Sequence, residues 1–266
     1  MGSEAQPQII GTIVLIHGMW CTPWVWDNFM FSLTLAGYKP LALELKFHSN
    51  GPGNSRHLLG TTGLEGYKED IVRQLGQIPG PVHLIGHSMG GLLAAKAASQ
   101  GPKEIRNRVK TLVLITPAAP YGINGLTGTV MKSFLGPLVR GWPFWKNPIK
   151  PTFQEAQYAM LHLLPEEEQK RIYQDLVWES GRAAFQCGFW PLDKTRAARV
   201  DEIHCPVLVL AGSQDRITPA PVVKKIAQKL GAEYKEFSGH AHWLLAEPGW
   251  EEILEFIIGW IQKKSS

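Results

Sequence analysis

Short, mostly apolar runs alternate with segments whose apolar residues recur at helical spacing along the first 117 residues. The runs predict strands at 13–16, 40–45, 82–85 and 111–115, and the periodic segments predict helices at 25–37, 64–77 and 92–99. Strands that alternate with helices are typical of a mostly parallel sheet that carries helices on both faces. The predicted fold class is therefore α/β.

This alternation stops near residue 117 and returns near residue 205. The intervening stretch is rich in Pro, Gly and Trp, and it predicts helices at 152–164 and 166–178 but no strand. The chain then continues with predicted elements in the order strand, helix, strand, helix, at 207–210, 220–230, 234–237 and 249–261. We expect an α/β core of residues 1–117 and 205–266, and a helical lid of residues 118–204 inserted after the fourth strand. Because ligands bind at the carboxyl ends of parallel strands, an insertion there would cover the site.

Composition and charge narrow the class of protein. Hydrophobic residues make up 44% and charged residues 19% of the chain, which fits a globular protein with a sizeable core. The net charge is +4, and because Lys and Arg are scattered, no nucleic-acid or anionic membrane partner is indicated. The N-terminal apolar run has about seven residues, far short of the ~20 that span a bilayer, so we expect no stable membrane insertion.

The three cysteines, Cys21, Cys187 and Cys205, lie far apart and form no C-x-x-C pair. Such a sparse, odd set favours neither a disulfide framework nor a zinc site, and it fits a reducing compartment. The sequence therefore predicts a cytoplasmic protein. It carries no signal for the oligomeric state.

Residues 86–90 read Gly-His-Ser-Met-Gly and match the pattern G-x-S-x-G. The pattern stands between an apolar strand and a helical run, where a tight turn requires small residues on both sides of the serine. The N-terminus of a helix also stabilises developing negative charge. Ser88 is therefore the candidate nucleophile, and the alternative is a purely structural Ser/Gly turn.

A serine hydroxyl needs a general base, and the base needs an acid that orients it. Asp215 lies in the polar loop after the strand at 207–210, and His240 and His242 follow the next strand. The order serine, acid, histidine is the one that accompanies this type of turn. Asp215 is the candidate acid, although an aspartate in a loop can also be a helix cap or turn former.

These motifs together resemble the α/β-hydrolase superfamily over nearly the whole chain. Residues 17–20 (His-Gly-Met-Trp) are similar to the family's H-G-x loop, residues 86–90 to its nucleophile elbow, and residues 212–215 to its acid loop. The resemblance implies a serine hydrolase that needs no metal or organic cofactor. It also implies that the backbone N–H groups of Met19 and Met89 form the oxyanion hole.

The family pattern also bears on the choice of base. Members commonly have Glu five residues after the catalytic histidine and Pro close behind, and Glu247 and Pro248 stand in that relation to His242. His242 is therefore preferred to His240. A His-x-His metal site is the alternative, but no acidic or cysteine ligands accompany the pair.

Two departures from the family pattern refine the expectation. Ser88 stands where epoxide hydrolases and haloalkane dehalogenases have Asp, which disfavours those branches. The strand that leads to His17 comes almost at the start of the chain, so we expect a sheet that is trimmed at one edge.

Many of the ten tryptophans lie near the predicted site or in the predicted lid. Aromatic side chains commonly line apolar pockets, although they can equally hold a lid on its core. The candidate substrate contacts are Trp20, His87, Trp142, Trp145, Trp178 and Trp190.

The predicted function is a carboxylic ester hydrolase that acts on a small to medium hydrophobic ester, a small-molecule substrate, through an acyl-enzyme. Because one fold hosts many chemistries, several alternatives stay open. They are a thioesterase, a lactonase, a C–C hydrolase, a cofactor-free lyase and a non-catalytic ligand-binding protein of the same fold.

Overall fold

A six-stranded sheet forms the centre of the molecule in the computed structural model, which describes residues 9–48 and 56–265. Its strand order is β2-β1-β3-β4-β7-β8, and every neighbouring pair is parallel. The strands are β1 (Gly11–Ile16), β2 (Tyr38–Leu43), β3 (Val82–His87), β4 (Val109–Ile115), β7 (Val207–Gly212) and β8 (Glu233–Phe237). The predicted α/β class is confirmed.

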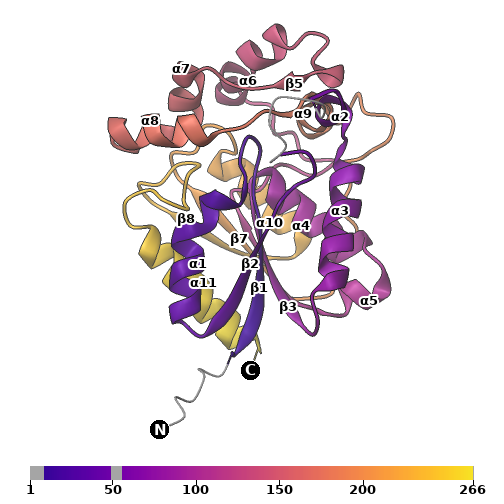
Figure 1. The fold of residues 1–266 in the computed structure, drawn as a ribbon, viewed down its shortest axis with the longest axis vertical. Helices are drawn as coiled ribbons and strands as arrows, with labels where there is room; N and C mark the ends of the chain where they lie inside the picture. Colours follow the sequence, from indigo (N-terminus) through magenta and orange to yellow (C-terminus); the bar gives the residue numbers. More distant parts are fainter. Residues whose placement is uncertain (1–8, 49–55, 266) are drawn as a thin grey trace, which may run out of the picture.

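Helices cover both faces of this sheet (Figure 1). One face carries α1 (Asp27–Leu35), which follows the 3-10 turn Pro23–Trp26, and α11 (Trp250–Ser265). The other carries α3 (Leu64–Gln77), α4 (Met89–Gln100) and α5 (Lys103–Arg106), while α10 (Ala220–Leu230) packs along β7. Strands β3 and β7 are buried along their whole length, because side chains from both helical layers cover them.

Residues 118–204, here called the helical insertion, lie over the carboxyl ends of the strands (Figure 1). Their helices are α6 (Gly128–Arg140), α7 (Phe153–Ala156), α8 (Glu166–Asp175) and α9 (Gly181–Gly188), with a 3-10 turn at Phe144–Lys146 and a π-helical turn at Gln157–Leu161. Helix α2 (Arg56–Thr61) belongs to the predicted core range but packs on the insertion, where the Ser180 hydroxyl donates to the carbonyl of Thr62 at 2.6 Å.

Sequence periodicity located the regular helices of the core but not all elements of the insertion. The helices predicted at 64–77 and 220–230 have these bounds in the structure. Helix α6 was missed because Gly136 and Pro137 interrupt its helix-forming residues. The prediction of no strand between 117 and 205 was wrong: β5 (Pro148–Ile149) and β6 (Glu179–Ser180) pair antiparallel, and two residues are too few to produce an alternating pattern.

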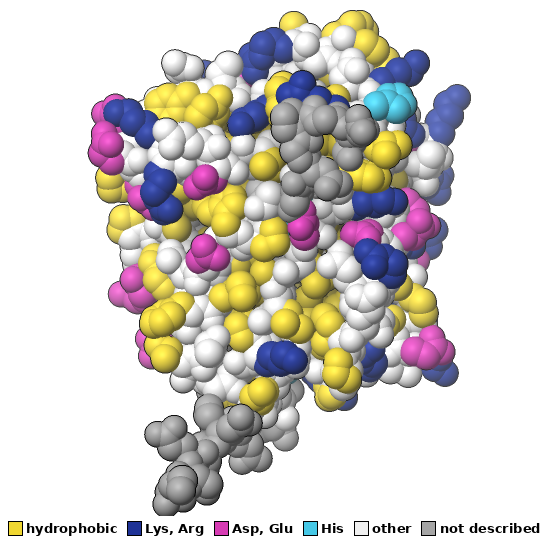
Figure 2. Space-filling view, in the orientation of Figure 1, with side chains coloured by type: hydrophobic (Ala, Val, Ile, Leu, Met, Phe, Trp, Pro, Cys, Tyr) yellow, Lys and Arg dark blue, Asp and Glu magenta, His cyan; other side chains and the backbone are white. Residues whose placement is uncertain are grey.

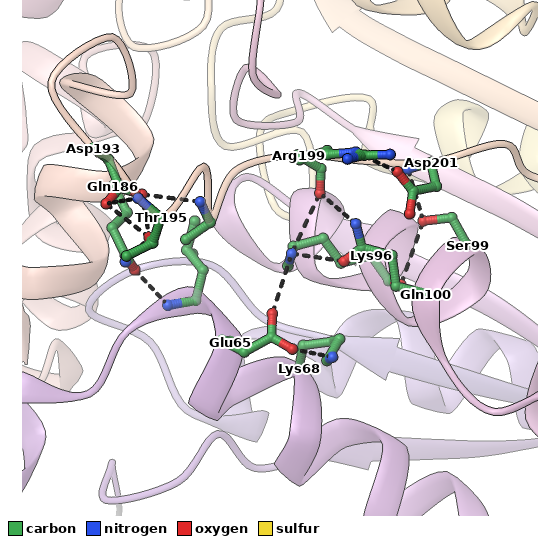
Figure 3. Close-up of polar contacts among 12 residues, drawn as sticks. Glu65, Lys68, Lys96, Ser99, Gln100, Gln186, Asp193, Thr195, Arg199 and Asp201 are labelled. Atoms are coloured by element: carbon green, nitrogen blue, oxygen red, sulfur yellow. Dashed lines mark hydrogen bonds and ion pairs between the residues drawn. The ribbon is translucent and has the colours of Figure 1, made fainter.

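A buried lysine joins the chain that returns from the insertion to the core (Figure 3). Lys96 on α4 is 1% exposed, and its Nζ lies 2.8 Å from Gln100 Oε1, 3.3 Å from the carbonyl of Arg199 and 3.5 Å from Glu65 Oε2. Because an unpaired buried ammonium group is costly, these partners hold α3, α4 and the returning chain together.

The surface shows no segregation of charge on the face seen in Figure 2, where basic, acidic and hydrophobic side chains are interspersed. Of the helices in the described ranges, none combines the length and hydropathy that crossing a bilayer requires.

Candidate active site

Ser88 lies at the sharp turn between β3 and α4, with φ 55° and ψ −123°. Positive φ in a residue with a side chain is strained, and such strain persists only where the surroundings hold the backbone. Here the Ser88 N–H donates to the carbonyl of Ile115 at 2.9 Å, and the residue is buried. The turn therefore presents the serine side chain above the end of the sheet in one fixed orientation.

The two glycines of the motif are required because the backbone passes close to them on both sides. A Cβ on Gly86 would lie 2.4 Å from the carbonyl oxygen of Gly90, and a Cβ on Gly90 would lie 2.2 Å from that of Ile16. Both neighbours belong to buried backbone, which cannot shift as the end of a flexible side chain can. The pattern G-x-S-x-G thus follows from the packing of this turn on itself and against β1.

Gly90→Ala is expected to lower the free energy of unfolding by about 3 kcal/mol, because the added methyl group overlaps buried backbone. Thermal unfolding and urea titration measure the change. The matched control is Gly76→Ala on the exposed face of α3, where a Cβ meets nothing within 4 Å and helix propensity favours alanine. A Gly90→Ala protein as stable as wild type would contradict this account of the turn.

The structure brings Ser88, His242 and Asp215 together from three separate loops. His242 Nε2 lies 3.0 Å from Ser88 Oγ, and His242 Nδ1 lies 2.8 Å from Asp215 Oδ2. Because a carboxylate only accepts hydrogen bonds, Nδ1 carries the proton of the neutral ring, and Nε2 is left to accept the hydroxyl proton of Ser88. This is the geometry that a serine nucleophile and its base require.

The surroundings of Asp215 keep its side chain ionised and fixed. Its Oδ1 accepts from the N–H groups of Ile217 at 2.7 Å and Thr218 at 2.8 Å, and the Thr218 hydroxyl lies 2.8 Å from Oδ2. Burial raises the pKa of Asp215, but His242 and the hydrogen bonds from His242 and Thr218 outweigh burial, and the pKa lies below its usual value. Asp215 can therefore stabilise a positive charge that develops on His242.

His240, the other candidate base, contacts Glu247, and the histidine that contacts Ser88 is His242. His240 Nδ1 lies 3.2 Å from Glu247 Oε2, and the same carboxylate accepts from the backbone N–H groups of Ala241 at 2.8 Å and Trp243 at 2.9 Å. Glu247 is 1% exposed, and burial raises its pKa even though these hydrogen bonds oppose the effect. Glu247 thus holds the loop on both sides of His242, which gives a physical reason for the spacing of Glu after His.

His87, next to Ser88, binds the backbone of His242. Its Nε2 lies 2.9 Å from the carbonyl of His242, so Nε2 carries the ring proton. Burial, and then the neighbouring His242, lowers the pKa of His87 to about 3, which keeps the ring neutral. His87 lines the small hollow between Ser88 and His242, so it shapes the site.

Met19 lies in the loop after β1 and Met89 is the first residue of α4, and both residues line the cavity beside Ser88. Within the described ranges, the backbone N–H of neither residue donates a hydrogen bond to a backbone or side-chain acceptor. Trp20 holds the loop of Met19 to the helical insertion: its Nε1 donates to the carbonyl of Ile149 at 3.2 Å, and its own carbonyl accepts from the Val177 N–H at 2.8 Å.

The comparisons with known proteins agree with this geometry. A family model described as "Alpha/beta hydrolase family" matches residues 13–254. The chain belongs to the alpha/beta hydrolase family.

Relatives of this hydrolase include a pimeloyl-(acyl-carrier protein) methyl ester esterase of Neisseria meningitidis, 26% identical over 221 residues that cover 81% of this chain and 80% of that protein. A 2-hydroxy-6-oxononadienedioate/2-hydroxy-6-oxononatrienedioate hydrolase of Paraburkholderia xenovorans is 26% identical over 92% of this chain and 83% of that protein. Among solved structures, the monoacylglycerol lipase of Paleococcus ferrophilus has a TM-score of 0.69 and 24% identity, and the match covers 97% and 96% of the two chains. Because its identity is low, the similarity to the lipase structure shows a shared fold only.

An apolar cavity opens beside Ser88 between the core and the helical insertion of this hydrolase. The part of its lining that comes from the core is Met19, Ser88, Met89, Ile217, Thr218 and Val222. The insertion supplies Ala118, Ala119, Gly125, Leu126, Val130, Met131, Phe134, Leu138, Ala184, Cys187, Gly188 and Phe189. Helices α6 and α9 thus form one wall, and sequence reasoning missed it because it missed α6.

Four tryptophans predicted to contact substrate lie elsewhere, and this expectation is corrected. Among the described residues that line the cavity beside Ser88, none is Trp142, Trp145, Trp178 or Trp190. Trp142 is 67% exposed and Trp178 39% exposed, and both line a separate groove. The Trp190 Nε1 donates to the carbonyl of Ile123 at 3.0 Å. Position within the insertion did not reveal which side of each element faces the serine.

Two further features of the site concern metals and cysteines. Over the described ranges, no group of three or more His, Cys, Asp or Glu side chains is arranged to hold a metal ion.

All three cysteines are free. Cys187 lines the cavity, and burial raises the pKa of its thiol to about 12, which keeps it protonated.

Proposed function

We propose that this hydrolase cleaves carboxylic esters with Ser88 as nucleophile, His242 as general base and Asp215 as the orienting acid. The observation that carries the proposal is the continuous contact from Asp215 through His242 to Ser88, which lines an apolar cavity. The backbone N–H groups of Met19 and Met89, which have no acceptor among the described residues, suit an oxyanion.

In the proposed reaction, Ser88 Oγ attacks the ester carbonyl carbon while its proton passes to His242 Nε2. The carbonyl oxygen becomes an oxyanion that accepts hydrogen bonds from the Met19 and Met89 N–H groups. His242 then gives the proton to the leaving alkoxide, and the acyl group stays on Ser88. A water molecule that loses its proton to His242 attacks the acyl carbon, and the return of that proton to Ser88 Oγ releases the acid.

The cavity lining supports a hydrophobic substrate. None of the described residues that line it is Lys, Arg, Asp or Glu, so a charged substrate group would be buried there without a partner. This argues against the dicarboxylate named for the Paraburkholderia relative, and the named methyl ester of the Neisseria relative supports an ester. We propose that residues 118–204 act as the lid over this cavity and that the protein is cytoplasmic.

The test is a series of p-nitrophenyl esters from acetate to dodecanoate, with a thioester and an anilide of the same acyl groups. We expect kcat/KM to rise from acetate to medium-length chains as more apolar surface is buried, and the anilide to be cleaved far more slowly. Ala184→Phe adds bulk to the cavity wall on α9. In the same series, this substitution is expected to lower kcat/KM for medium-chain esters by on the order of tenfold relative to acetate. Preferred cleavage of the thioester would favour a thioesterase, and no cleavage of any acyl donor would contradict the proposal.

A further inference from the structure

Glu179, in strand β6 of the helical insertion, is completely buried and binds two residues of the core. Its Oε1 accepts from the Tyr67 hydroxyl at 2.8 Å, and its Oε2 lies 3.0 Å from His48 Nε2. Its Oε1 also accepts from the N–H of Ser180 at 2.6 Å. Tyr67 lies on α3 and His48 follows β2, so one carboxylate joins the insertion to two elements of the core.

From His48 the hydrogen bonds continue to the loop that contains Met19. His48 Nδ1 lies 3.2 Å from the carbonyl oxygen of Leu45, and the Leu45 N–H donates to His17 Nε2 at 3.2 Å. His17 Nδ1 in turn lies 2.9 Å from the carbonyl oxygen of Gly18. The rings of His17 and His48 also pack edge to face, with centroids 5.2 Å apart.

The partners of each ring fix its protonation state. Both nitrogens of His48 face acceptors, so both carry protons and the ring is a cation paired with the Glu179 carboxylate. Burial lowers the pKa of His48, but the contact with Glu179 outweighs burial and the pKa is raised. His17 faces one donor and one acceptor and is neutral, in agreement with burial that lowers its pKa to about 3.

The last contact of this path reaches the oxyanion donor. The carbonyl of Gly18 and the N–H of Met19 belong to one planar peptide unit, in which the two groups point in opposite directions. A hydrogen bond that fixes the Gly18 carbonyl therefore also fixes the direction of the Met19 N–H.

We propose that Glu179 is a positioning residue that sets the Met19 N–H of the oxyanion hole through His48, Leu45 and His17. The inference rests on the proposed function of the Ser88 site and adds a residue of the insertion to it. The oxyanion hole is then complete only when the helical insertion packs on the core with Glu179 between Tyr67 and His48. Hydrogen bonds are stronger when they are buried and when a partner is charged, as in the pair of His48 and Glu179. Such contacts can hold the peptide plane between Gly18 and Met19 in one orientation.

The decisive variants are Glu179→Leu and Glu179→Gln. Leucine breaks the path, and we expect kcat for the best ester to fall about 100-fold while KM changes little, as when an oxyanion donor is lost. The affinity for an alkyl trifluoromethyl ketone, whose adduct with Ser88 carries an oxyanion, is expected to fall in the same proportion. Glutamine can accept from Tyr67 and donate to a neutral His48 ring, so Glu179→Gln is expected to recover most of both losses.

The matched control is Gln186→Leu. Gln186 on α9 also anchors the insertion, because its Oε1 accepts from the Leu64 N–H at 2.8 Å and its Nε2 donates to Thr195 Oγ1 at 3.4 Å (Figure 3). Among the described residues, none of its hydrogen-bond partners belongs to the path to His17. We expect Gln186→Leu to lower the thermal unfolding midpoint but to keep wild-type kcat and inhibitor affinity.

If Glu179→Leu does not fold, His17→Leu, which breaks the far end of the same path, replaces it and is expected to show the same losses. Wild-type kcat and ketone affinity in the folded leucine variant would overturn the inference while leaving the proposed function intact. Equal kinetic losses in Gln186→Leu would also overturn it, because seating of the insertion alone would then explain them. A wild-type protein that neither hydrolyses esters nor binds the ketone would overturn the proposed function and this inference with it.

Discussion

Ser88→Ala is expected to lower kcat for ester hydrolysis by about 10⁴- to 10⁶-fold while the protein remains folded. The hydroxyl is the group that contacts His242 Nε2 at 3.0 Å, and its loss removes the atom that would form the acyl-enzyme. Residual turnover would come from substrate binding and the N–H groups of Met19 and Met89, which the substitution leaves in place. Alanine at a position with φ 55° keeps the backbone strain of serine, so little change in stability is expected.

The loss is measured with the best ester of the chain-length series and with a fluorophosphonate probe, whose site of attachment is mapped by mass spectrometry. The matched control is Ser99→Ala, a buried serine at the other end of α4, whose hydroxyl accepts only from the backbone N–H of Asp201 among its described donors. We expect wild-type protein and Ser99→Ala to be labelled at Ser88, and Ser88→Ala to be unlabelled. Probe attached to another residue with full activity in Ser88→Ala would refute the assignment of the nucleophile.

The sequence was sufficient for the parts of the site that depend on local backbone geometry. The turn at Ser88 needs glycines at fixed positions, and the loops of Asp215 and His242 follow strands that apolar runs reveal. Parallel strands bring such loops to one edge of the sheet, so the order of the strands predicted which loops meet.

The choice between the two histidines needed more than strand order. His240 and His242 lie on the same short loop, and residue spacing to Glu247 favoured His242 only through a family resemblance. The structure adds the physical reason, because the carboxylate of Glu247 binds the backbone on both sides of His242 and the ring of His240.

Contacts between distant segments could not be predicted in this way. The pair His48 and Glu179 joins residues 131 positions apart, and neither belongs to a recognisable motif. The cavity wall depends on which side of α6 faces Ser88, and Pro137 concealed the helix itself. The exposed Trp142 shows the same limit, because an aromatic residue in the insertion can face either the cavity or solvent.

His242→Ala is expected to lower kcat about as far as Ser88→Ala does, by at least about 10⁴-fold, because no other described base contacts Ser88 Oγ. His240→Ala is its matched comparison. That variant removes one of three hydrogen bonds to Glu247 and leaves the two backbone donors that hold the loop, so the expected loss is less than about tenfold.

The two variants are compared at a temperature where circular dichroism shows both to be folded, with and without added imidazole. The cavity left by His242→Ala lies between Ser88 and Asp215, so free imidazole is expected to restore part of the activity there and none in His240→Ala. Fluorophosphonate labelling of Ser88 is expected to slow in His242→Ala by a factor similar to the loss in kcat, because both reactions need the hydroxyl proton removed. A large loss confined to His240→Ala would assign the base to the other histidine, and it would require the loop held by Glu247 to rearrange before Ser88 can react.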